Sequence, residues 1–116
     1  MSGPTKVIYY KTENGESPIS DFLDSLYKKQ QAKILRILRT VEEYGLLSIL
    51  PHVKKLREYP LWEIRILGKD SVRVMYMQQH KSQIILLHGF IKKTNRTPHR
   101  EIQIALKRMK QIIKWS

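Results

Sequence analysis

The sequence contains no cysteine, and this absence excludes several structural and chemical classes. A chain without thiols cannot form a disulfide scaffold, a thiolate zinc site or a cysteine nucleophile. The four histidines show no metal-binding spacing, so we expect no metal and no cofactor. No apolar run approaches the roughly 18–20 residues of a membrane-spanning helix. No cationic segment followed by an apolar stretch marks a secretion signal, so we expect a cytoplasmic protein that binds no membrane.

Acidic residues are scarce, and their distribution is uneven. The chain has 22 lysines and arginines against 10 aspartates and glutamates, a formal net charge of +12. Residues 1–50 hold seven basic and six acidic residues, whereas residues 51–116 hold fifteen and four. Such a surplus favours a polyanionic partner, nucleic acid or a ribonucleoprotein, over a surface that only serves solubility. A two-metal nuclease is disfavoured, because such a site needs several clustered carboxylates.

The first half of the chain has the patterns of one strand and two helices. At 116 residues and 41% hydrophobic composition, we expect one domain over residues 1–116 with a real core. The β-branched and aromatic residues 6–11 predict a strand. Ser17-Pro18 is a helix start, and apolar residues at helical spacing then predict two consecutive helices. These should form an antiparallel hairpin that ends at Gly45.

The second half changes period. Alternation over residues 61–67, then strand patterns at 72–77 and 84–90, predict an antiparallel meander with short turns at residues 68–70 and 80–82. Thr97-Pro98 repeats the helix-start signal and precedes a C-terminal amphipathic helix. The predicted fold is α+β, in the order β-α-α-β-β-β-α. It has a small antiparallel sheet, an N-terminal helical hairpin and a C-terminal helix.

Alternation in the predicted strands indicates where cationic side chains gather. Arg65 and Arg73 each lie between apolar residues and should leave the helix-covered face, while His88 and Lys92 share one face of the last strand. These four residues are the candidate catalytic residues. Antiparallel pairing could bring Arg65, Arg73 and Lys92 onto one exposed face. Each has an alternative: Arg65 pairs with Glu63, Arg73 is an edge charge against aggregation, and His88 is a hydrogen-bonded core residue.

One metal-free reaction suits this composition, the attack of an RNA 2′-hydroxyl on the adjacent phosphate. The substrate supplies its own nucleophile, so the protein must orient it, stabilise phosphoryl charge and move protons. Arginine binds phosphate oxygens bidentately, and a desolvated lysine can serve as base. Further basic residues flank the strands and are candidates for binding the RNA backbone, or form a solvated face: Lys54, Lys55, Arg57, Lys93 and Arg96.

Several motifs carry a family resemblance. The stretches L-W-E-I-R-I (61–66), V-R-V-M-Y (72–76), L-L-H-G-F-I-K-K-T (86–94), T-P (97–98) and E-I-x-x-A (101–105) resemble the HigB-like branch of the RelE/ParE toxin superfamily. P-I-S-D-F-L-D-S-L (18–26) resembles its first helix. The resemblance implies a RelE-like fold and the toxin of a bacterial type II toxin–antitoxin pair. It further implies a metal-independent endoribonuclease (an mRNA interferase) that cuts mRNA on the ribosome and so inhibits translation.

The resemblance also implies partners and site residues. The partner would be an antitoxin with a helix-turn-helix DNA-binding domain, through which alone the toxin would meet operator DNA. By position, Arg65 and Arg73 match the family's strand arginines, and Lys92 falls near the basic residue after its last strand. The chain lacks the tyrosine that some relatives carry near their end, which leaves the general acid unassigned. Two alternatives stay open: a ParE-like gyrase inhibitor without nuclease activity, and a basic nucleic-acid-binding module.

Overall fold

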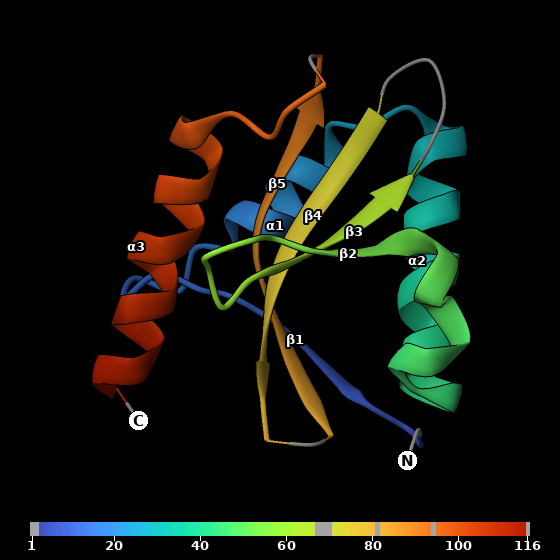
Figure 1. Ribbon diagram of the computed structural model, residues 1–116, viewed down its shortest axis with the longest axis horizontal. Coiled ribbons are helices and arrows are strands. Elements are labelled where there is room, and N and C mark those ends of the chain that lie inside the picture. The colour runs from blue at the N-terminus through green and yellow to red at the C-terminus, as the bar shows by residue number, and fades with distance from the viewer. Residues whose placement is uncertain (1–2, 67–70, 81, 94, 116) are drawn as a thin grey trace.

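The computed structural model describes residues 3–66, 71–80, 82–93 and 95–115, and it contains a five-stranded sheet in the spatial order β1-β5-β4-β3-β2 (Figure 1). The strands are β1 (Lys6–Tyr9), β2 (Val53–Lys55), β3 (Trp62–Ile66), β4 (Ser71–Gln79) and β5 (Gln83–Lys92). The helices are α1 (Pro18–Asp24), α2 (Lys28–Tyr44), the 3₁₀ helix η1 (Leu46–His52) and α3 (His99–Trp115). The predicted α+β fold class is confirmed.

The structure differs from the predicted sheet in two respects. It adds η1 and the short strand β2, which pairs antiparallel with β3. In addition, β1 pairs parallel with β5, so the sheet is mixed rather than antiparallel throughout. Local periodicity in the sequence could predict neither difference. The three residues of β2 are too few to show alternation, and the pairing partner of β1 depends on distant sequence. The predicted turn at residues 68–70, together with Leu67, lies outside the described residues.

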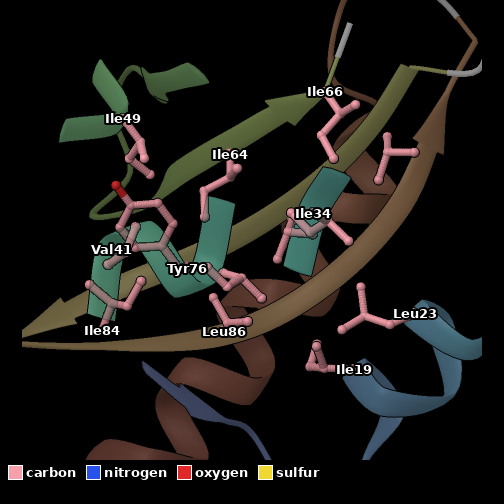
Figure 2. Close-up of a cluster of buried hydrophobic side chains, with 13 residues drawn as sticks. Ile19, Leu23, Ile34, Val41, Ile49, Ile64, Ile66, Tyr76, Ile84 and Leu86 are labelled. Atoms are coloured by element: carbon pink, nitrogen blue, oxygen red, sulfur yellow. The ribbon is translucent and has the colours of Figure 1, made fainter. Parts of the chain in front are cut away.

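One face of the sheet packs against α1 and α2. Its core combines residues of both helices with alternate residues of β3, β4 and β5, as Figure 2 shows. The helices lie on the same face, but α1 packs mainly on β5, whereas α2 packs on β1 and β3. The close approach of α1 requires Gly89 in β5, because a Cβ atom there would lie 2.2 Å from the ring of Phe22.

The opposite face packs against α3, which lies across the sheet from α2 in Figure 1. The second core cluster joins Met75, Leu87 and Phe90 of the sheet to Ile102 and Ala105 of α3. The β4–β5 register shifts at Met75, so that Leu87 is an extra residue on β5. This bulge reverses the alternation of the strand after Leu87, so that His88, Phe90 and Lys92 face the α3 side while Gly89 and Ile91 face α1 and α2. Within the described residues, no helix is both long and apolar enough to cross a membrane.

Candidate functional site

Four cationic side chains converge on the α3 side of the sheet, near the start of β4. Arg65 lies directly opposite Arg73 in the β3–β4 pairing, and Lys92 lies opposite Ser71 in the β4–β5 pairing. Lys54 lies on the neighbouring strand β2, on the same face by alternation. We call Lys54, Arg65, Arg73 and Lys92 the cationic face. They come from four consecutive strands of the sheet, which is why no contiguous motif contains them.

A fully buried carboxylate lies among these cations. The Glu63 Oε1 atom is 3.8 Å from Arg73 Nε, and Thr97 donates a hydrogen bond of 2.6 Å to the other carboxylate oxygen. Glu63 therefore pairs across the strands with Arg73, rather than with Arg65 on its own strand. With four cations against one carboxylate, the group carries a formal charge of +3. The pairing offsets only part of the repulsion between the cations.

The cationic face and Glu63 contain buried polar atoms that make no hydrogen bond. Among the described residues there are three such side-chain atoms: Glu63 Oε1, Arg65 Nε and Arg73 Nε. Like charges placed directly opposite in adjacent strands are destabilising, and so are unsatisfied buried donors. Folding therefore maintains this arrangement at a cost in stability. A bound anion with several acceptor oxygens would satisfy both guanidinium groups.

Burial divides the cationic face into a covered floor and an exposed rim. Arg73 and Lys92 are only 5% and 9% exposed, whereas Arg65 is half-buried and Lys54 is exposed. The expectation of an exposed face is therefore wrong for Arg73 and Lys92. Burial lowers the pKa of Lys92, and the neighbouring charge of Arg73 lowers it further, although Glu63 opposes this change. Lys92 thus releases its proton more readily than an ordinary lysine.

His88 is a residue of β5, and its side chain contacts α3. Its Nε2 atom is 2.7 Å from Glu101 Oε1, and the Arg108 guanidinium is 3.4 Å from its Nδ1. Arginine can only donate, so Nδ1 accepts and Nε2 carries the hydrogen that His88 donates to Glu101. Burial lowers the pKa of His88, which favours this neutral form. The ring also stacks on Phe90, with centroids 5.7 Å apart. These contacts tie His88 to the docking of α3.

Two of the remaining basic candidates lie on the opposite face of the sheet. Lys55 follows Lys54 but points to the other face, where its ammonium lies 4.9 Å from the Trp62 ring centroid. Lys93 likewise lines a groove on the α1–α2 side. Arg57 and Arg96 are exposed in the segments before β3 and α3. Of the five predicted RNA-binding residues, the structure places only Lys54 within the cationic face.

Sequence reasoning did not assign Glu63 and Thr97 to the site. The facing of Glu63 follows from the alternation that also placed Arg65, so this signal was present. Thr97 was expected to cap the last helix, but that helix begins at His99, and Pro98 accepts the first backbone hydrogen bonds. The Thr97 hydroxyl therefore reaches Glu63. No group of three histidine, aspartate or glutamate side chains in the described part of the chain could hold a metal ion.

Comparison with known proteins identifies the family. A family model described as phage-derived protein Gp49-like (DUF891) matches residues 21–110, which include all four strands of the cationic face. No match was found among curated proteins. The Gp49-like family is a toxin-like family of the RelE/Gp49 type, and its membership implies an antitoxin partner. The match covers 90 of the 116 residues, and the chain therefore belongs to the Gp49-like family of toxin–antitoxin-type toxins.

Proposed function

We propose that this toxin belongs to the HigB-like branch and is a metal-independent endoribonuclease that cleaves mRNA on the ribosome. The observation that carries the proposal is the pair Arg65 and Arg73, which lie directly opposite each other and whose buried Nε–H groups make no hydrogen bond. A phosphodiester supplies both the negative charge and the acceptor oxygens that this pair needs. The formal charge of +3 on the surrounding group also repels a divalent metal ion, which favours a metal-free reaction.

The chemistry would follow from these positions. The scissile phosphate binds between Arg65 and Arg73, whose guanidinium groups stabilise the charge that develops on its non-bridging oxygens. The 2′-oxygen forms a bond to phosphorus while the bond to the 5′-oxygen breaks, and the products are a 2′,3′-cyclic phosphate and a 5′-hydroxyl. Neutral Lys92 accepts the 2′-proton, and solvent water supplies the proton that the 5′-oxygen takes up. The lowered pKa of Lys92 enlarges its neutral fraction.

The test measures cleavage of mRNA on programmed ribosomes by wild type, Arg65→Ala and Arg73→Ala. Each variant removes one group that stabilises charge in the transition state, so we expect a rate about 100- to 1,000-fold lower. Arg39→Ala is the matched control, because it removes the same charge from an exposed position on α2. Circular dichroism and binding to the antitoxin establish that each variant is folded.

Three outcomes would contradict the proposal. Cleavage at the wild-type rate by both Arg65→Ala and Arg73→Ala would refute the role of the cationic face. DNA breaks without RNA cuts after induction, detected in the same cells, would instead identify a gyrase inhibitor. Binding to nucleic acid that weakens steeply with salt, without cleavage or growth arrest, would identify a basic binding module.

A further inference from the structure

A groove lies on the face of the sheet opposite the cationic face, where the end of β5 meets the junction of α1 and α2. Its volume is about 360 Å³, and its lining residues are Ser25, Leu26, Tyr27, Gln30, Ile91 and Lys93. The apolar part of this lining comes from residues that pack against the first core cluster, including Leu26 and Ile91. The base of the groove is therefore held in place by the packed core.

An aromatic ring and several lysines surround the groove. The side chain of Tyr27 is 73% exposed, although the backbone of this residue is held at the start of α2 by a hydrogen bond of 3.1 Å to the side chain of Gln30. Lys28 and Lys29 follow in the first turn and are exposed, as is Lys93. Lysines are unfavourable in the first turn of a helix, where the backbone dipole favours acidic residues. Folding alone gives no reason for this combination of an exposed ring and positive charge.

The groove and the cationic face share one strand end. Lys92, the last residue of β5, belongs to the cationic face, and Lys93, which directly follows the strand, lines the groove on the opposite face of the sheet. Consecutive Cα atoms are only about 3.8 Å apart. Figure 1 shows that the C-terminal end of β5 lies at the top of the sheet. A polynucleotide that leaves the cationic face around this end of the sheet would meet Lys93 and then Tyr27.

We propose that this groove is a second binding subsite for single-stranded RNA, in which a base outside the scissile bond stacks on Tyr27 and its phosphate pairs with Lys93. The inference rests on the proposed nuclease function and extends the footprint of the same substrate. Stacking on an aromatic ring tolerates every base, because each base has a π-face. The subsite therefore adds affinity for a continuous strand without selecting a sequence.

The test measures binding of single-stranded RNA by fluorescence anisotropy, with a 2′-deoxy nucleotide at the scissile position to prevent cleavage. The oligonucleotides have the sequence cut in cells and increase in length on either side of the scissile position. For wild type we expect the affinity to rise in one step, once the strand reaches the groove. Tyr27→Ala removes this step and weakens binding of the longest strand by about 5- to 150-fold, as expected for the loss of one stacked base.

Controls separate stacking from stability and from the cleavage site. Tyr27→Phe retains the step because it retains the ring, and Lys93→Glu abolishes it without changing Tyr27. Tyr44→Ala removes another exposed ring, at the other end of α2, and retains the step. Arg73→Ala weakens binding at every length. If folded Tyr27→Ala and Lys93→Glu bind all lengths as wild type does, the subsite is refuted, whereas loss of cleavage in Arg73→Ala would still support the nuclease function.

Discussion

The substitution Glu63→Gln tests whether a buried carboxylate holds the cationic face together. Glutamine has nearly the same size as glutamate, and its side-chain oxygen can still accept the hydrogen bond from Thr97. The substitution therefore removes the charge and preserves most of the packing. It leaves four cations with no internal counter-ion, two of them almost fully buried.

The expected loss of stability follows from the geometry. At 3.8 Å, the Glu63–Arg73 attraction is about 4 kcal/mol for an effective dielectric constant of about 20. Removing one partner of a buried ion pair typically destabilises a protein by about 3–5 kcal/mol, because the other charge stays buried and unpaired. We therefore expect the free energy of unfolding to fall by about 3–5 kcal/mol. This is a large share of the roughly 5–15 kcal/mol that stabilises a typical domain.

Urea unfolding at low and high salt measures this loss. Part of it is repulsion between Lys54, Arg65, Arg73 and Lys92, so the deficit of Glu63→Gln should shrink in about 1 M salt, where the screening length is about 3 Å. The double variant Glu63→Gln/Arg73→Gln also removes the unpaired cation and should recover much of the stability, with an unchanged denaturant slope. Equal stability of wild type and Glu63→Gln at low salt would refute the counter-ion role of Glu63.

Two further predictions concern the packing of the helices on the sheet. Gly89→Ala should lower the free energy of unfolding by about 1–3 kcal/mol, because its Cβ would overlap the Phe22 ring, and Phe22→Leu in the same chain should restore part of the loss in thermal unfolding. Burial lowers the pKa of His88, so the unfolded state binds its proton more readily, and stability should fall as the pH drops below about 6.5. Urea unfolding at about pH 8 and about pH 5 measures this effect. Between these two pH values, the free energy of unfolding should fall less in His88→Gln than in wild type. An equal fall in both proteins would contradict the contribution of His88.

The facing of the strand arginines could be predicted from sequence because it depends on a local period. In a strand, neighbouring side chains point to opposite faces, so Ile64 and Ile66 determine where Arg65 points. The same reasoning applies to Arg73 between two buried valines. Burial could not be predicted in this way. The cover over Arg73 and Lys92 depends on long-range packing, and the contact between Thr97 and Glu63 joins residues 34 positions apart.

The pairs Lys54–Lys55 and Lys92–Lys93 show how the alternation of side chains in a strand could have narrowed the set of candidate residues. Adjacent residues of a strand cannot share a face, so Lys54 and Lys55 had to separate once residues 53–55 formed β2. A strand of three residues gives no periodic signal of its own, and the sequence therefore left both lysines as candidates. Lys92 and Lys93 also lie on opposite faces, but Lys92 is the last residue of β5 and Lys93 follows it, and both lie beyond the predicted strand at 84–90.

The parallel pairing of β1 with β5 has a consequence for how the chain is made. Lys6 pairs with Gln83, so the first strand has no partner until most of the polypeptide has been synthesised. Contacts between such distant residues slow folding, because a long loop must close before they form. A nascent chain that stops before residue 83 holds Arg65 and Arg73 but has neither the partner of β1 nor Lys92. The toxin therefore acquires its complete sheet only late in its own translation.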